Sequence, residues 1–236
     1  MTRTIRPSHT LRALGARCAP ALLAALALLL LPPPPPARAE GRTGLLFEGT
    51  FESGDLTGFY WHQNQPQVVP ADAHPVRAGR YAMRCYLHRY NSAYAYRTEV
   101  IAGSRDTNPP GTKDPFYLAA GGEYWVGFST FVPQDMVVDR PHVEDIVFQM
   151  QASPDPGEDY RSPVFALNVD EDRWMIVVRW DARRDSGPGN SFQGSEKVYQ
   201  APLGPSLGAW TDWVIHVKWS HTDSGLLEVW RDAERV

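Results

Sequence analysis

Short segments that alternate apolar and polar side chains recur along this chain, and Gly, Pro, Asn or Asp bounds each of them. They are rich in β-branched and aromatic residues, the pattern of β-strands separated by turns. Helical periodicity is rare after residue 39. The pattern predicts an all-β domain, an antiparallel β-sandwich of the jelly-roll kind. The expected strands are 45–48, 82–88, 93–100, 123–131, 144–151, 163–170, 173–180, 210–219 and 226–231.

Residues 1–39 have the organisation of a secretory signal peptide. Arginines precede an apolar run at 21–31, and a proline run and Ala37-Arg38-Ala39 follow it. The run is shorter than the ~20 residues that span a bilayer, so we expect cleavage after Ala39 and not a membrane anchor. The sequence therefore predicts a secreted protein, extracellular or periplasmic, without membrane contact after cleavage.

The predicted mature chain, 40–236, has the length of one domain. The leader holds five of the 23 basic residues and none of the 27 acidic ones, so its removal takes the net charge from −4 to about −9. Such a surface repels nucleic acid and anionic membranes. Cys85 is the one cysteine that remains, so no intrachain disulfide can form. We expect a monomer that is neither a nucleic-acid binder nor a disulfide scaffold.

The alternation also sorts side chains into a core face and an open face. Cys85, Ile146 and Trp180 are expected to face inward. The expected centre of the core is Phe148, Phe165, Trp174, Ile176, Trp213 and Ile215. If the strands from 82 to 180 share one sheet, its open face is polar and suits a polar polymer. Arginines gathered in 77–113 favour an anionic ligand, and an unevenly charged solvated surface is the alternative.

Several kinds of catalytic or metal site are disfavoured by the motifs present. The G-x-S-x-G sequence at 204–208 lacks the strand–turn–helix context of a serine nucleophile. No H-E-x-x-H sequence or cysteine pair indicates zinc. The acids of 155–159 and 170–172 have oxygen ligands for a structural Ca²⁺ but no EF-hand spacing, so we expect solvated loops and no cofactor. Adjacent residues on a strand point to opposite faces, so Glu144 and Asp145 do not form a glycosidase pair.

Two motifs point to a more specific interpretation. The sequence Y-R-T-E-V at 96–100 resembles the R-[ST]-E-[LV] strand of jelly-roll polysaccharide lyases, and F-Q-M-Q at 148–151 occupies the place of their Q-x-H strand. The stretches 47–56, 123–128, 210–219 and 227–232 resemble the opening, central and late strands of the same proteins. The resemblance is to heparin-lyase-like and glucuronan-lyase-like proteins with a concanavalin A-like fold, and it covers most of 44–236.

This resemblance implies β-elimination on a polysaccharide that contains uronic acid. Arg97 and Gln149 would neutralise the uronate carboxylate and stabilise the charge that develops on it. Gln151 stands where the family has a catalytic His, and an amide is no useful proton acceptor. His88 is therefore the expected base, with an ordinary surface histidine as the alternative. The expected substrate-binding residues on the open face are Arg84, Tyr86, Glu99, Asn168 and Arg179. Glu99 is expected to orient Arg97 or an adjacent Tyr.

The sequence given ends at Val236, before the family's Y-F-K-x-G-x-Y strand and the Tyr that serves as acid or base. We therefore expect a sandwich that lacks its C-terminal strand or strands, with slow or absent lyase turnover. A non-catalytic carbohydrate-binding protein on the same scaffold is the alternative. In either case the expected partner is an anionic polysaccharide.

Overall fold

The computed structural model describes residues 44–86, 97–102, 118–136, 144–183, 186–189 and 192–236. Residues Gly44–Val236 form one compact unit. The predicted signal peptide, His88 and most of the loop expected at 103–122 lie outside the described residues. The strands are β1 (Phe59–Gln63), β2 (Gln67–Pro70), β3 (Tyr81–Arg84), β4 (Thr98–Ala102), β5 (Glu123–Phe131), β6 (Asp145–Met150), β7 (Phe165–Asp170), β8 (Arg173–Trp180), β9 (Gly194–Pro202), β10 (Trp210–Lys218), β11 (Leu226–Arg231) and β12 (Glu234–Arg235).

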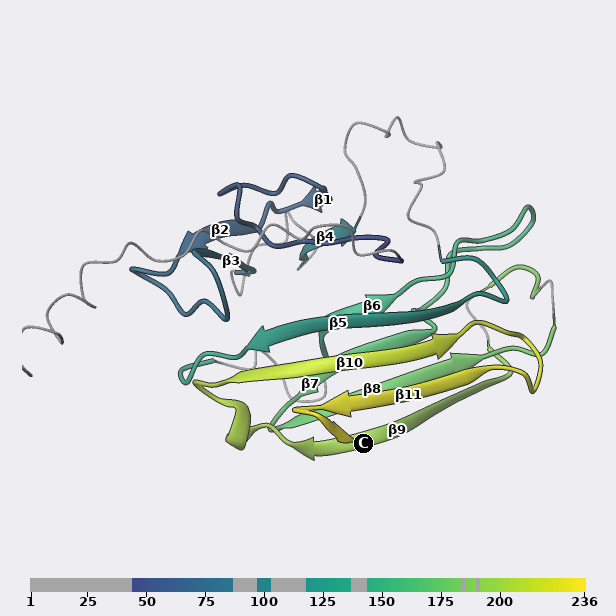
Figure 1. The fold of residues 1–236 in the computed structure, drawn as a ribbon. Coiled ribbons are helices and arrows are strands. Elements are labelled where there is room, and N and C mark those ends of the chain that lie inside the picture. Colours follow the sequence, from purple (N-terminus) through teal and green to yellow (C-terminus); the bar gives the residue numbers. More distant parts are fainter. Residues whose placement is uncertain (1–43, 87–96, 103–117, 137–143, 184–185, 190–191) are drawn as a thin grey trace, which may run out of the picture. The chain divides into compact units, whose positions relative to one another are not determined.

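Antiparallel pairing assembles these strands into sheets (Figure 1). One four-stranded sheet has the order β6-β7-β8-β9, and a second has the order β12-β11-β10-β5. Two further pairs, β1-β4 and β2-β3, form two-stranded sheets. A short 3₁₀ helix, η4 (Gly204–Ser206), lies between β9 and β10. The predicted all-β antiparallel sandwich is thereby confirmed.

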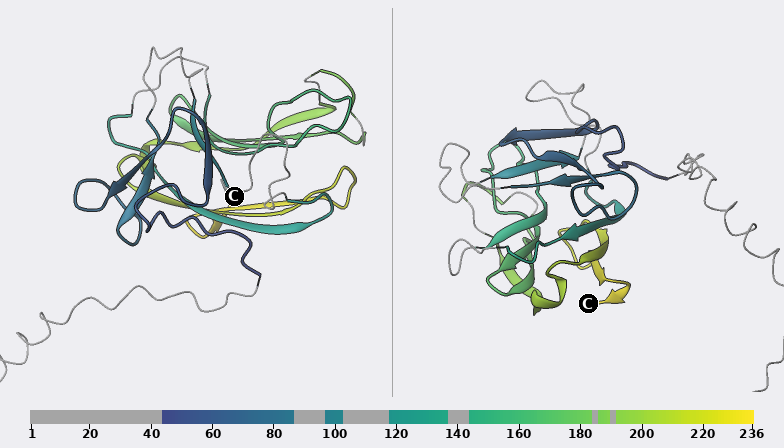
Figure 2. Two further views of the ribbon diagram at one scale, coloured as in Figure 1. Left: turned by 90° about the horizontal axis from the view of Figure 1, so that it is seen from above. Right: turned by 90° about the vertical axis from the view of Figure 1, so that its left-hand side faces the viewer.

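The two four-stranded sheets form the two layers of the sandwich (Figure 2, left). Aromatic side chains pack between them. Trp174 of β8 meets Trp213 of β10 edge to face, with ring centroids 5.2 Å apart. Phe128 of β5 stacks on Phe148 of β6 at 4.4 Å. Burying this apolar surface is the main favourable contribution to folding, and Cys85 is free and adds no crosslink. Five of the six expected central residues are buried, and Phe148 is partly buried against the same cluster.

Strand prediction succeeded both for β5, which has one open face, and for β8, which is buried on both faces from Trp174 to Val177. The bounds of β5, β8 and β11 are those expected. The strands expected at 82–88 and 93–100 are described as β3 and β4, with different bounds, and residues 45–48 form no strand. Strands β1, β2, β9 and β12 were not predicted. Strand β9 is mostly exposed and polar and therefore carries little alternation.

The strands expected between 82 and 180 do not share one sheet, so the condition for a single polar face is not met. Among the described residues, β3 pairs with β2 and β4 pairs with β1, whereas β6 belongs to the sheet β6-β7-β8-β9. The hydrogen-bonding partner of a strand depends on residues far away in sequence, and the alternation within the strand carries no information about it. The polar face expected on one sheet is therefore divided among several sheets.

In the part of the chain that the structure describes, three side chains expected in the core are exposed instead. Ile146 is 50% exposed, because the β6–β7 register shifts between Ile146 and Phe148 and a bulge turns a side chain to the other face. Trp180 is 47% exposed at the last position of β8, and its ring covers Gly194. Cys85 follows the end of β3, where the alternation of a strand no longer applies, and it is exposed.

Within the described ranges, no helix has the length and apolar character that would let it cross a membrane.

Candidate active site

A hydrogen-bonded group of three side chains joins the two motifs that the sequence singled out. Glu99 of β4 accepts a hydrogen bond from Arg97 Nη1 at 3.3 Å and another from Gln149 Nε2 of β6 at 3.2 Å. One carboxylate therefore holds a guanidinium and an amide beside one another. The side chain of Glu99 is 23% exposed and that of Arg97 is 55% exposed, so the guanidinium remains accessible to a ligand.

The strands β6 and β4 determine where the side chains of Arg97, Glu99 and Gln149 point. Phe148 and Met150 lie against the core, so the side chain of Gln149 between them turns away from it. Arg97 directly precedes β4, and antiparallel pairing with β1 positions that strand. Arg97 and Gln149 come from segments that belong to different sheets, and the Glu99 carboxylate links them. The expected pairing of Glu99 with Arg97 is observed, whereas the Gln149 link across the two motifs was not predicted.

Arg84 and Tyr86, two of the expected binding residues, lie close to one another. The Arg84 guanidinium carbon is 5.1 Å from the centre of the Tyr86 ring, and the Tyr86 side chain is half exposed. Asn64 Nδ2 donates to the Tyr86 carbonyl at 3.1 Å and fixes the backbone there. These two residues form a basic and aromatic surface, and they remain candidates for contact with an anionic ligand.

Three other expected site residues are held in local hydrogen bonds. Asn168 is 1% exposed, and its amide donates to Glu144 Oε2 at 2.7 Å, so the prediction that it lies open to solvent is wrong. Arg179 Nη1 donates to the Pro163 carbonyl at 2.8 Å. Gln151 Nε2 donates to the Arg161 carbonyl at 2.6 Å. These contacts stabilise strand ends and loops, and His88 lies outside the described residues.

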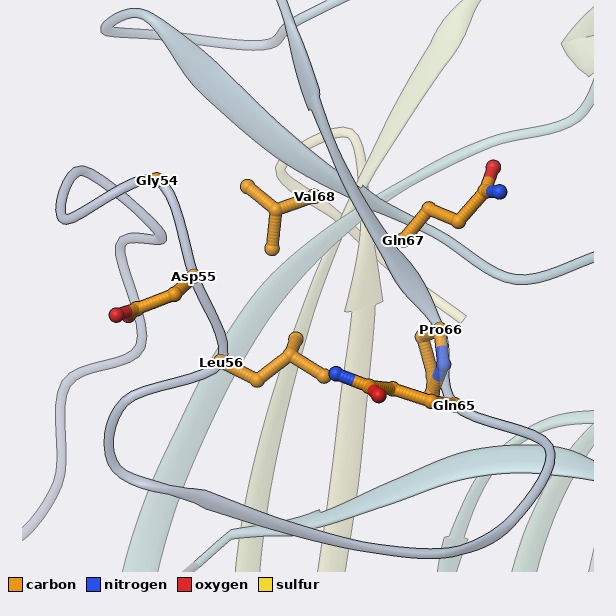
Figure 3. Close-up of a pocket in the computed structure, with 7 residues that line it drawn as sticks. All are labelled: Gly54, Asp55, Leu56, Gln65, Pro66, Gln67 and Val68. Carbon is orange, nitrogen blue, oxygen red and sulfur yellow. The ribbon is translucent and has the colours of Figure 1, made fainter.

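A shallow pocket in the described part of the chain shares no residue with the group at Glu99 (Figure 3). Its one carboxylate, Asp55, points away from Val68 in this view and accepts hydrogen bonds from Ser53 Oγ at 2.6 Å and Thr57 N at 2.9 Å. The Ser53 and Thr57 bonds lower the pKa of Asp55, which suits a turn-forming residue better than a proton acceptor. The pocket is lined by Gly54, Asp55, Leu56, Gln65, Pro66, Gln67 and Val68.

The described residues contain no group of three or more His, Cys, Asp or Glu side chains arranged to hold a metal ion. Two of the acids considered for Ca²⁺ bind backbone amides of a neighbouring loop: Glu158 accepts from Ser186 N, and Asp159 accepts from Gly189 N at 2.8 Å. Their oxygens thus fasten one loop to another, which is a structural role.

The serine of the G-x-S-x-G sequence is structural as well. Ser206 is 2% exposed, and its Oγ accepts hydrogen bonds from Trp174 Nε1 at 2.9 Å and Arg231 Nη2 at 2.7 Å. Neither an indole nor a guanidinium can take the hydroxyl proton, so the pattern does not mark a nucleophile.

Residues 51–236 match the family model described as polysaccharide lyase. The chain belongs to the polysaccharide lyase family. The match includes both strands of the Arg97–Glu99–Gln149 group in this lyase-family chain. No curated protein and no solved structure matches the chain.

Proposed function

We propose that this chain is a secreted lyase that cleaves a polysaccharide containing uronic acid by β-elimination, with Arg97, Glu99 and Gln149 at its active site. The observation that carries the proposal is the Glu99 carboxylate, which holds the Arg97 guanidinium and the Gln149 amide in one cluster. The leader predicted at residues 1–39 supports secretion.

The elimination requires that the uronate carboxylate be neutralised. A base removes the C5 proton, the C4–C5 double bond forms, and the C4–O bond breaks to release the 4-linked sugar. Negative charge develops on the carboxylate of the uronate as the C5–H bond breaks. A guanidinium can bind that carboxylate with two hydrogen bonds, and an amide can supply a further donor. Donors fixed before the reaction stabilise such charge most effectively, and Glu99 fixes both.

Proton transfer is the step for which the described residues offer no strong candidate. Gln151 takes the place of the family's His, and its amide is bound to the Arg161 carbonyl. His88 remains the base that the sequence favours. General acid–base catalysis contributes ~10² to 10⁴ in rate, so a chain with a substituted base should turn over slowly.

The test is an assay of the recombinant chain on several polyuronates, followed by the near-ultraviolet absorbance of the unsaturated uronate product. We expect slow turnover that Arg97→Ala abolishes with the fold intact. The matched control is Arg173→Ala, a half-exposed arginine on β8, which should behave as wild type. Unaltered affinity and turnover in Arg97→Ala would remove Arg97 from the site.

His88→Ala tests the base separately. The residual turnover should vanish in this variant. In the wild type it should rise with pH through ~6.5, where an unperturbed imidazole loses its proton. Turnover that survives the change would show that another group takes the C5 proton.

A second candidate function is carbohydrate binding without catalysis on the same scaffold. The observation that favours it is Gln151, an amide in the expected position of a proton acceptor and engaged with a backbone carbonyl. The same assay separates the two functions: a binding protein would retain the polyuronate without any gain in absorbance.

A further inference from the structure

A tryptophan lies flat and exposed on the outer face of the sheet β12-β11-β10-β5. Tyr124 and Val126 of β5 pack against the core, so Trp125 between them points outward and is 63% exposed. An exposed fraction this large is unusual for the largest apolar side chain, because its surface would gain from burial. The exposed indole therefore calls for a functional explanation.

Two neighbouring aromatic side chains hold the indole of Trp125 in place. Its ring stacks on the imidazole of His216, with centroids 4.0 Å apart and planes inclined by 8°. The Trp230 ring lies 5.4 Å away at 26°. Strand pairing sets His216 of β10 opposite Trp125 and opposite Glu228 of β11, so Trp125 covers the buried imidazole and leaves its outer face to solvent.

The imidazole is itself fixed by two carboxylates. His216 Nδ1 lies 2.9 Å from Glu228 Oε2, and His216 Nε2 lies 2.7 Å from Glu123 Oε1. Both bonds together prevent the ring from rotating, and they raise the pKa of His216, with Glu228 the larger cause. The imidazole on which the Trp125 ring stacks is thus ordered before any ligand binds. This order reduces the entropy cost of binding.

Charges around the indole are close to balanced. The carboxylates of Glu123 and Glu228 are matched by Arg235, whose Nη2 lies 2.9 Å from Glu228 Oε1, and by Lys218, opposite Glu123 in the strand register. Protonation of His216 adds a further positive charge. A balanced surface gives little attraction to a polyanion, and carboxylates engaged with cations are poor partners for a cationic ligand. An uncharged ligand with an apolar face and hydroxyl groups fits this surface best.

We propose that Trp125 and its rim, Glu123 and Arg235, bind uncharged pyranose rings of a polysaccharide chain. The C–H face of a sugar would stack on the open face of the indole. Glu123 and Arg235, with side chains 53% and 65% exposed, are placed to accept from and donate to the sugar hydroxyls.

This surface is separate from the proposed lyase site. Gln149 points away from the core on the sheet β6-β7-β8-β9, and Trp125 points away from it on the opposite sheet. The Trp174–Trp213 contact shows that the core lies between these sheets. One sugar cannot reach both sites, so Trp125 would hold a second, uncharged stretch of polymer beside the chain that is cleaved.

Affinity electrophoresis and calorimetry on the full chain test the proposal, with a soluble β-glucan, a galactomannan and a polyuronate as probes. We expect the wild type to bind at least one uncharged probe and Trp125→Ala to lose ~10-fold or more in affinity for it. Trp125→Tyr keeps a smaller aromatic face and should bind at an intermediate strength. The matched control is Tyr160→Ala, an exposed aromatic (78%) from a loop outside this surface, which should bind as wild type.

Unfolding curves are measured for each variant to show that it is folded. If Trp125→Ala does not fold, the affinity of Trp125→Tyr for the uncharged probe tests the proposal. The proposal is overturned if neither uncharged probe is bound by the wild type, or if Trp125→Ala and Trp125→Tyr bind like wild type. Binding of the polyuronate alone would also overturn it. Loss of lyase turnover in Arg97→Ala with unchanged binding of the uncharged probe would support two independent sites. Absence of turnover in the wild type would count against the proposed lyase function alone.

Discussion

Ser206 connects the two four-stranded sheets through buried hydrogen bonds, and we predict that Ser206→Ala destabilises the protein by ~3 kcal/mol. Its Oγ accepts from Trp174 Nε1 of β8 at 2.9 Å and from Arg231 Nη2 of β11 at 2.7 Å. Thr211 Oγ1 of β10 lies 3.1 Å from the same oxygen. Removal of one hydroxyl therefore affects donors on three strands.

The magnitude follows from the donors that would lose their partner. Trp174 is 0% exposed, so its indole N–H cannot turn to water, and a buried unsatisfied donor costs ~1–3 kcal/mol. The Arg231 side chain is 16% exposed and keeps its hydrogen bond from Nη1 to Tyr199 Oη at 3.1 Å. The stability lost when Arg231 Nη2 loses its acceptor is therefore smaller than the ~1.5–3 kcal/mol typical of a charged donor. The contributions share one acceptor and do not add fully, which gives a total of ~3 kcal/mol.

Urea unfolding and thermal unfolding measure the effect. At ~2–4 °C per kcal/mol for a domain of this size, the melting temperature should fall by ~6–12 °C. The matched control is Ser220→Ala, an exposed serine bonded to Thr222 and Ser224, which should change stability by less than ~0.5 kcal/mol. If Ser206→Ala unfolds within ~0.5 kcal/mol of wild type, the buried bonds do not contribute as argued.

Two further predictions concern pH. Glu228 and Glu123 raise the pKa of His216, so its ion pairs stabilise the fold fully below ~6.5 and are lost as the pH rises through the raised value. Urea unfolding between pH 6 and 9 should show a decline in stability that His216→Gln removes, and an equal decline in the variant would contradict this assignment. Hydrogen bonding to Arg77 holds the pKa of Asp212 at about 2, so its contribution is present above ~3.9 and is lost as the pH falls toward 2. Arg77→Ala should raise the pKa of Asp212 in a titration followed by NMR; an unchanged value would show that Arg77 is not the cause.

The fold class and most of the core could be predicted from the order of residues alone. A strand with one buried face repeats every two residues, and β5 carries that repeat from Glu123 to Phe128. Strand β8 is buried on both faces from Trp174 to Val177, and its β-branched and aromatic residues predicted it. The two-residue repeat predicted Trp174 and Trp213 in the core. It failed for Ile146, where a bulge shifts the register, and it missed β9, where few side chains are buried.

The candidate site was only partly accessible to sequence reasoning. Sequence reasoning predicted that Arg97, Glu99 and Gln149 line one groove, but it could not show that the Glu99 carboxylate binds both of the others. Motif resemblance also selected Gln151, and the polar face of its strand selected Asn168; hydrogen bonds to Arg161 and Glu144 engage these two side chains. Such partners lie on loops and strands whose positions depend on the packing of the whole unit.

The amino-acid sequence alone determines the local features of this protein. Strand alternation and turn residues depend on neighbouring side chains, and the net negative charge depends on composition. Contacts between distant segments are not determined locally. His216 lies 93 residues from Glu123 in sequence, and the Trp174–Ser206 and Arg77–Asp212 contacts are likewise remote. Each depends on sheet register and on how the sheets pack, which are cooperative properties of the entire fold. Only the tertiary structure could therefore place a rigid indole on one face and the Glu99 group on the other.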